Sequence, residues 1–168
     1  FRAVQESESA MRGTLLDLAR SGSETFRFEC ELAPGDSWNH LEIELRAGND
    51  GLRIVKEEAR GDSDSPPLYR VETSPTAFTH DLTVSYNNFA RGGKKPQIAC
   101  TDQQAVFTQL LTPARFGENH ERSQREIPEA ARRFMDALGQ ILFLDPMPRR
   151  MRGYSFIVDK VLKGDGSN

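Results

Sequence analysis

The chain has 168 residues, 37% of them hydrophobic and 28% charged, with a net charge of −3 at pH 7 and a sequence pI near 5.7. This length suits one domain with a single buried core, and the acidic balance argues against wholesale coating of nucleic acid while leaving room for local basic patches. No window approaches the roughly 20 apolar residues of a membrane span, and the first residues lack the basic and apolar zones of a signal peptide, so we expect a cytoplasmic protein without a membrane partner.

The first segment, residues 1–22, is predicted to be a helix. Its apolar residues recur at helical spacing, and Gly22 is well placed to cap the end of the helix. The chain does not begin with Met, so we expect either a processed chain or a piece of a longer one. The apolar positions are Phe1, Val4, Met11, Leu15, Leu18 and Ala19.

From residue 24 the hydrophobic period changes to two, which predicts strands with one dry face and one wet face. Turn sequences at 34–36 and 48–51 separate these strands, so residues 24–58 are expected to form an antiparallel meander. The dry face is predicted to carry Phe26, Phe28, Cys30 and Leu32 from the first strand and Leu41, Ile43 and Leu45 from the second. The second turn leads into a third strand with Leu52, Ile54 and Lys56 at alternate positions.

Two further strands are predicted at 68–73 and 78–86, after a polar loop at 60–67. The Arg-Gly-Asp triplet in that loop is interpreted as plain loop sequence, because three-residue matches are common and a cytoplasmic chain gives it no receptor. The second strand is expected to place Phe78, His80, Leu82, Val84 and Tyr86 on one face.

The histidines and cysteines do not predict a metal site. His80 is interpreted as a half-buried structural residue, because no second His or Cys stands at metal-ligand spacing, and His40 and His120 are equally isolated. Cys30 and Cys100 lie in strand-like or apolar sequence without a paired-cysteine spacing, so we expect both to be reduced and buried.

The segment 87–96, NNFARGGKKP, is predicted to be a flexible basic loop. A phosphate-binding loop of the Walker A type needs G-x-x-x-x-G-K-[ST] between a strand and a helix, whereas here Lys95 and Pro96 follow Lys94. Lys94 and Lys95 are therefore candidate contacts for DNA or another acidic surface, with simple exposure to solvent as the alternative.

Helical periodicity returns after residue 100. Thr101 and Gln104 fit a capping box at the start of a first helix, which Pro113 ends. Residues 117–126 are interpreted as a charged connector, and Pro128 as part of the first turn of a second helix. The expected buried stripes are Val106, Phe107, Leu110 and Leu111 in the first helix and Ala131, Phe134, Met135, Leu138 and Leu142 in the second, with 141–144 leaving it as a short strand.

No catalytic motif is found in the sequence, and no catalytic residue is assigned. The C-terminal stretch ILFLDPMPRRMRGYS, followed after a short spacer by VLKGDGSN, resembles the RecF/SMC-like family of AAA (ABC-type) ATPases. In that family an apolar strand, a D-P-x-P-x-x-M-R turn and an L-x-x-D-G-x-N-L junction lie between the P-loop half and the signature/Walker B half. The matching residues are Leu144, Asp145, Pro146, Pro148, Met151, Arg152, Leu162, Asp165, Gly166 and Asn168.

The resemblance implies an α+β fold, the insertion lobe of a P-loop ATPase head, built as an antiparallel β-meander sheet with flanking helices. On this reading the chain is a single-domain fragment. Its parts are the helix that follows the P-loop at 1–22, a strand-rich lobe at 23–100, a helical part at 101–144, and the Pro/Arg turn with the DGSN junction at 145–168.

For function, the resemblance implies a parent ATPase that binds ATP and Mg²⁺ and works as a homodimer, with Walker A upstream and the signature and Walker B downstream. The segment itself is expected to hold no cofactor and to be inactive alone, because P-loop amides, Lys and Ser/Thr act together. Its expected partners are the remainder of the ATPase head and DNA or an effector protein, in DNA repair or phage defence. Residues 165–168 are expected to cap a helix that continues beyond them.

Three arginines in the Pro-rich turn, Arg149, Arg150 and Arg152, are the main candidate contacts for DNA or a partner. The competing hypothesis is a stand-alone α+β binding module in which these arginines recognise phosphate or carboxylate, for which the bidentate guanidinium is suited. A purely structural alternative pairs them with nearby acids such as Asp145 and Asp159.

Overall fold

The computed structural model describes residues 23–33, 35, 37–48, 51–61, 65–73 and 80–140. The chain divides into two compact units, Phe1–Asp136 and Ala137–Asn168, and residues 137–140 are the described part of the second. The predicted helix at 1–22, the predicted strand at 141–144 and the whole family motif lie outside the described residues.

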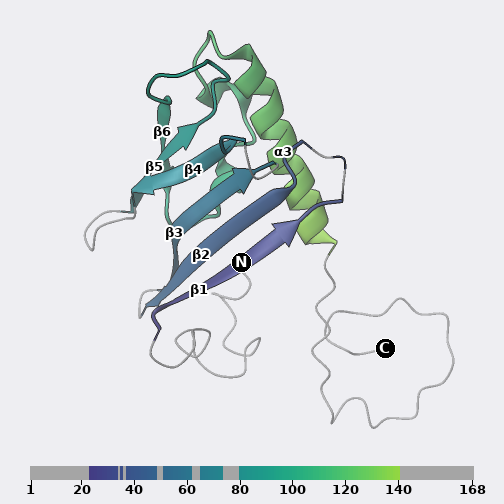
Figure 1. Ribbon diagram of the computed structural model, residues 1–168. Coiled ribbons are helices and arrows are strands. Elements are labelled where there is room, and N and C mark those ends of the chain that lie inside the picture. Colours follow the sequence, from purple (N-terminus) through teal and green to yellow (C-terminus); the bar gives the residue numbers. More distant parts are fainter. Residues whose placement is uncertain are drawn as a thin grey trace, which may run out of the picture. The chain divides into compact units, whose positions relative to one another are not determined.

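Six strands form one antiparallel sheet in which every strand pairs with its neighbours in the sequence (Figure 1). The predicted α+β fold with an antiparallel β-meander is therefore confirmed. The sequence analysis did not predict a separate strand after the basic loop 87–96, where the structure places the sixth strand. The strands are β1 (Thr25–Glu31), β2 (His40–Gly48), β3 (Gly51–Arg60), β4 (Tyr69–Thr73), β5 (Asp81–Tyr86) and β6 (Gln97–Thr101).

A β-bulge in the β2–β3 hairpin changes the face that β3 presents to the core. Leu45 pairs with Ile54 but Glu44 pairs with Lys56, so Val55 is the extra residue of the bulge. An inserted residue inverts the inward and outward alternation of the strand beyond it. The core therefore receives different side chains from the two halves of β3.

The bulge explains one wrong expectation for β3. Leu52 and Ile54 are buried as predicted, but beyond the bulge the inward side chains are Glu57 and Ala59, both fully buried. Lys56, which the simple alternation assigned to the same face as Ile54, is only half-buried and points to the opposite face.

The predicted first helix is much shorter than expected. Helix α2 covers only Val106–Gln109, its N-cap is Ala105 without a side-chain hydrogen bond, and Thr101 is the last residue of β6. The predicted capping box is therefore wrong. A short 3₁₀ turn, η2 (Pro113–Arg115), follows α2, so Pro113 begins a turn of its own.

The second helix is longer than expected. Helix α3 spans Glu121–Gly139, so most of the predicted connector is helical and Pro128 lies inside the helix. Burial of Ser123, Ile127 and Phe134 at helical spacing outweighs the hydrogen bond that an interior proline removes. Met135, predicted to be in the buried stripe, is instead 41% exposed.

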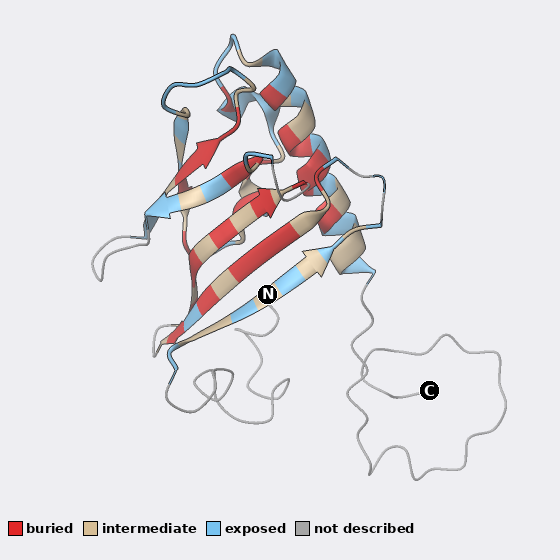
Figure 2. Cartoon of the chain, viewed as in Figure 1, coloured by how far each residue is buried: buried red, intermediate tan, exposed pale blue. Residues whose placement is uncertain are grey.

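The core lies between the sheet and α3, which runs along the sheet in Figure 1. Buried residues concentrate on the central strands β2 and β3 and on one side of α3, whereas β1 is only partly covered (Figure 2). The largest fully buried apolar side chains are Tyr69, Phe134, Leu41, Ile43, Leu45, Ile54, Leu68, Leu82, Leu110, Ile127 and Val84.

Cys100 is buried, Cys30 is half-buried, and both are free. Burial raises the pKa of both thiols above their ordinary value. Within the described ranges, no helix has the length and apolar character needed to cross a membrane.

Candidate functional site

The basic loop 87–96 packs directly against the first turns of α3. The hydroxyl of Ser123 donates a buried hydrogen bond of 2.8 Å to the carbonyl of Asn87. The guanidinium carbon of Arg122 lies 3.9 Å from the centroid of the Phe89 ring, which is cation–π geometry. The loop and the helix therefore form one continuous surface.

Contacts with the helix fix the shape of this loop against its backbone preference. Phe89 has a φ of 60°, in the left-handed region that bulky residues rarely adopt and that costs about 1–2 kcal/mol. Its N–H donates 2.9 Å to Asn87 Oδ1, and its ring centroid lies 6.1 Å from that of Trp38. These contacts, together with Arg122, offset the strain and give the loop a defined conformation.

Glu126 organises the side chains beneath this surface. Its two carboxylate oxygens accept hydrogen bonds from Trp38 Nε1 at 2.9 Å and from Arg122 Nε at 2.7 Å. Partial burial raises the pKa of Glu126, but the hydrogen bonds from Arg122 and Trp38 outweigh burial and bring it below the ordinary value. Glu126 is therefore ionised and already neutralised by protein groups at neutral pH.

An open hollow of about 230 Å³ lies beside Trp38. This volume is below the roughly 300–1,000 Å³ of most small-molecule sites, so the hollow suits one phosphate-sized or carboxylate-sized group better than a whole nucleotide. Three arginines and two glutamates dominate its wall. The lining residues are Ser37, Trp38, Arg122, Arg125, Glu126, Glu129 and Arg133.

The structure places the two lysines of the basic loop in different situations. Lys94 is exposed. The Lys95 ammonium instead donates to Asn87 Oδ1 and Asn88 Oδ1, each at 3.3 Å, and to the Ala90 carbonyl at 3.1 Å. Lys95 therefore shapes the loop. The proposed role of both lysines in contacting DNA or a partner stays a prediction.

Arg125 is the most accessible cation of the hollow. Its side chain is 72% exposed, and its contact with Glu126 is a long one of 3.8 Å. Arg91, in the adjoining loop, is also exposed. Pairs this open to solvent are worth little, so both guanidiniums are available to an external anion.

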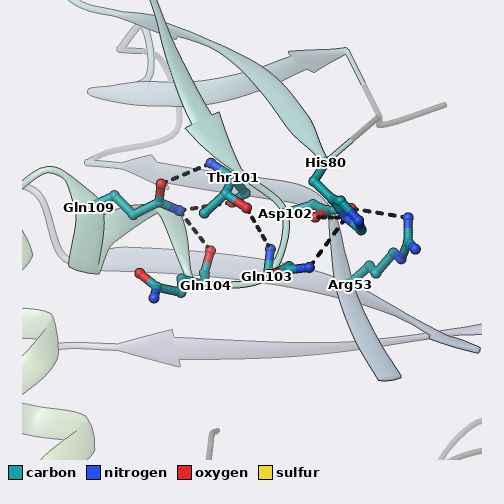
Figure 3. A network of polar contacts seen from close by, with 7 residues as sticks. All are labelled: Arg53, His80, Thr101, Asp102, Gln103, Gln104 and Gln109. Atoms are coloured by element: carbon teal, nitrogen blue, oxygen red, sulfur yellow. Dashed lines mark hydrogen bonds and ion pairs between the residues drawn. The ribbon is translucent and has the colours of Figure 1, made fainter. Parts of the chain in front are cut away.

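A second polar cluster lies where β6 ends (Figure 3). Asp102 is fully buried, with Oδ1 at 3.0 Å from His80 Nδ1 and Oδ2 at 3.6 Å from Arg53 Nη1. Its backbone N–H donates to the His80 carbonyl at 2.9 Å, and its carbonyl accepts from Ile54 N–H at 2.8 Å. Asp102 thus joins β3, β6 and the residue before β5.

The glutamine side of this cluster replaces the predicted capping box. The Gln109 amide accepts from Thr101 N–H and donates to the Thr101 and Gln104 carbonyls, each at 2.9 Å (Figure 3). These bonds tie α2 to the end of β6. Because Asp102 is completely buried and its neighbours bind one another, the cluster is a structural junction. His80 takes part in it as a structural residue, but it is exposed and does not share the buried face of Leu82 and Val84 as predicted.

Glu29, His40 and Glu42 bring their ligand atoms within 4.8 Å of one another. His40 therefore lies beside two carboxylates, which the prediction did not consider, although the cluster contains no second His or Cys. Glu29 lies directly opposite Glu42 in the β1–β2 register, and His40 is two residues before Glu42. Cross-strand neighbours of this kind have no signal in the spacing of a single strand.

Cationic side chains already occupy this cluster. Lys56 Nζ lies 2.7 Å and Arg27 Nη1 3.3 Å from Glu42 Oε1, and Arg60 Nη2 lies 3.2 Å from His40 Nε2. The hydrogen bond from Lys56 lowers the pKa of Glu42. A metal ion would have to displace these cations, so the residues fit an ion-pair cluster and not a metal site.

Glu57 is a second fully buried carboxylate, and it binds the start of α2. It accepts hydrogen bonds from Tyr69 Oη at 2.8 Å and from the N–H groups of Val106 and Phe107 at 2.7 Å each. Burial raises the pKa of Glu57 to about 7, against the opposing effect of these bonds. Its partners are all structural, so we assign Glu57 to the fold.

The arginines of the Pro-rich turn and the family motif lie outside the described residues, so their arrangement is not part of this site. Sequence reasoning missed Arg122 and Arg125, because the segment at 117–126 was interpreted as a connector, and it missed Trp38, which lies between a predicted turn and a predicted strand. The helical spacing of buried residues from 123 to 134 was the signal that could have placed both arginines on a helix.

Comparisons of the chain with family profiles, with curated proteins and with solved structures give no match. Function is therefore argued from the residues of the chain itself.

Proposed function

We propose that this chain is an internal, non-catalytic segment of an ATP-binding ATPase related to RecF and SMC proteins, with a regulatory or sensing role. The observation that carries the proposal is the sequence motif between residues 144 and 168. It combines a D-P-x-P-x-x-M-R turn with a D-G-x-N junction, and a match of Pro, Met, Arg and Gly at fixed spacing is more specific than alternating strand sequence.

The order of the elements supports the proposal. The six-stranded meander ends at Thr101, α3 follows at Glu121–Gly139, and the motif begins five residues after α3 ends, at Leu144. The resemblance implies this same order: first a strand-rich lobe, then a helical part, and then the motif. The antiparallel sheet is the kind of lobe expected there, and it would pack beside the nucleotide head.

A sensing role has a surface that suits it. The loop 87–96 and the first turns of α3 both carry exposed cations, and the contacts of Arg122 with Glu126 and Phe89 hold the loop against the helix. Because α3 continues in the sequence toward the motif, a partner bound at its first turns would act on the same helix that leads into the proposed head.

The first test uses nucleotide. Millimolar Mg-ATP is expected to leave the Tm of this chain unchanged, because the resemblance places the phosphate-binding loop in another part of the parent. Nucleotide bound at a hundredfold excess over its Kd would stabilise the fold by about 2.7 kcal/mol, which is a clear upward shift. A reproducible rise in Tm that requires magnesium would contradict a non-catalytic segment.

The second test uses the full-length parent. Replacement of Arg149→Ala together with Arg150→Ala is expected to reduce basal or DNA-stimulated ATP turnover while leaving the Tm in place. Unchanged turnover and unchanged DNA affinity would instead assign these arginines to structural pairs with acids such as Asp145 and Asp159.

The alternative function is a stand-alone α+β binding module with an arginine-rich recognition turn. It is favoured by the defined basic surface on α3, which needs no nucleotide head to form. The open reading frame separates the two proposals: a G-x-x-x-x-G-K-[ST] motif shortly before Phe1 supports the ATPase parent, and its absence from the whole frame supports the module.

A further inference from the structure

We infer that the surface formed by loop 87–96 and the first turns of α3 binds the phosphodiester backbone of nucleic acid without reading base sequence. This inference deepens the sensing role proposed above and rests on it. It assigns the partner class and the residues, and it places the contact on described elements and not on the Pro-rich turn.

The charge of this surface differs from that of the whole chain. The loop contains Arg91, Lys94 and Lys95 and no acidic residue, although the complete chain carries a net charge of −3. The hollow adds three arginines against two glutamates, and one of these, Glu126, is already hydrogen-bonded to Trp38 and to an arginine. Glu121 adds one exposed carboxylate at the start of α3, so the positive charge is concentrated in the loop and along the arginine side of the helix. A local cationic surface on an acidic chain is the expected footprint of a localised polyanion contact.

Arg122 is held ready for an anion. Its Nε donates to Glu126, and the face of its guanidinium lies over the Phe89 ring. Its side chain remains 57% exposed. A guanidinium fixed on one edge and one face presents its remaining donors to solvent with little freedom left to lose on binding.

The described residues of this surface expose no large aromatic or aliphatic side chain to a protein partner. Hot spots of protein interfaces are enriched in Trp, Tyr and Arg that become buried in well-packed pockets, and of these the surface exposes arginines alone. Among the described residues the exposed large hydrophobic side chain is Met135, which lies more than two turns beyond Arg125 on α3. Phosphate recognition needs only donors and positive charge, so a nucleic-acid backbone fits these residues better than an acidic protein does.

The aromatic residues here do not form a stacking platform. Trp38 is only 8% exposed, and Phe89 is half-buried with Arg122 over its ring. Bases recognised in single strands stack on exposed rings. The hollow is also small for a nucleotide. The contact is therefore made through phosphates, and affinity should be independent of sequence.

The test measures binding of the complete chain to a fluorescently labelled DNA duplex of about 20 base pairs by anisotropy over a range of salt concentrations. The test variant is Arg91→Ala with Arg125→Ala, because both side chains are exposed and neither supports the loop. The matched control is Arg46→Ala with Arg70→Ala, which removes the same charge from exposed strand positions.

We expect the test variant to bind roughly tenfold or more weakly at low salt, and its log–log salt slope to fall by about 0.9 for each phosphate contact removed. The control should keep the slope of the wild-type chain, and a scrambled duplex should bind equally well. Trp38, the one tryptophan of the chain, lies in the hollow and supplies an independent reading through a change in its fluorescence on binding.

Three outcomes would overturn the inference. The first is an equal loss of DNA affinity in the test variant and in the control, which would indicate that binding depends on overall charge and not on this surface. The second is displacement of DNA by polyglutamate at equal charge concentration, which would indicate an acidic polypeptide site. The third is loss of DNA binding in Arg149→Ala with Arg150→Ala but not in the test variant, which would move the contact to the Pro-rich turn and leave the proposed sensing role standing.

Discussion

The two faces of the sheet hold their side chains in place by different forces. On the face toward α3, Ile43 and Ile54 are at most 1% exposed and their burial is apolar. On the opposite face Glu42 is also buried, but it is surrounded by Lys56 and Arg27 at ion-pair distances. The degree of burial therefore does not distinguish the two faces. They differ in the side chains that surround a buried residue, which are apolar on the face toward α3 and charged around Glu42.

The largest effect should come from placing a charge on the apolar face. Ile43→Asp would bury a carboxylate without a partner, which costs several kcal/mol and is comparable with the roughly 5–15 kcal/mol stability of a whole domain. We expect this variant to be unfolded by circular dichroism and by thermal melting. A cooperative transition at the wild-type Tm would show that Ile43 does not face the core.

Glu57 is the exception on the apolar face and sharpens the comparison. Glu57→Gln would turn an amide N–H₂ toward at least one of three donors, and an unsatisfied buried group costs about 1–3 kcal/mol. Chemical denaturation should show this loss, and Tyr69→Phe, which removes one donor only, should cost less. A neutral Glu57→Gln would mean that the carboxylate does not bind α2.

The same residue predicts a pH dependence. Burial raises the pKa of Glu57 from 4.5 to about 7, so the folded state holds this proton more tightly than the unfolded state does. Its contribution, about 3 kcal/mol, is fully present below pH 4.5 and is lost as the pH rises to about 7. The difference in unfolding free energy between wild type and Glu57→Gln should therefore change across this window, and a constant difference would contradict the assignment.

The polar face should respond with a smaller effect of opposite pH sign. The hydrogen bond from Lys56 lowers the pKa of Glu42 below its ordinary value of 4.5, so its contribution is present above pH 4.5 and is lost as the pH falls through the folded-state pKa. Glu42→Gln should cost about 1–2 kcal/mol at neutral pH, measured by urea unfolding. An equal cost at pH 7 and at pH 3 would argue against the ion pair.

The smallest effect is expected at Glu44, the neighbour of Ile43 on the polar face. Its ion pair with Arg27 is 3.7 Å long and partly exposed, so Glu44→Lys should cost no more than about 1 kcal/mol even though it then faces Lys56. Denaturation of this variant beside Ile43→Asp tests the register directly, because equal tolerance of the two changes would show that the faces are assigned wrongly.

The strands were predictable because the alternation in β1 and β2 is unbroken. The bulge was not, since Ile54 and Val55 are both apolar and a sequence gives no sign of which one is the extra residue. Unbroken alternation from Leu52 and Ile54 would place Glu57 on the wet face. Its burial depends on the register shift and on the N–H groups of α2, which a single strand does not reveal.

The start of α3 shows how packing overrides local preference. Pro128 favours the first turn of a helix, yet burial of Ile127 and Phe134 against the sheet stabilises a helix that contains it. Of the candidate surface, the basic loop was visible in the sequence. Its contact with Arg122 was not, because that contact joins residues brought together only when α3 packs on the sheet.

The bonds that Glu57 makes to Val106 and Phe107 also affect local opening. The first N–H groups of a four-residue helix normally face solvent and exchange with deuterium quickly. Here both amides are bound by a core carboxylate 49 and 50 residues earlier in the chain. Their exchange should therefore require opening of β3, so that two amides in a short turn report the slow, cooperative opening of the central sheet.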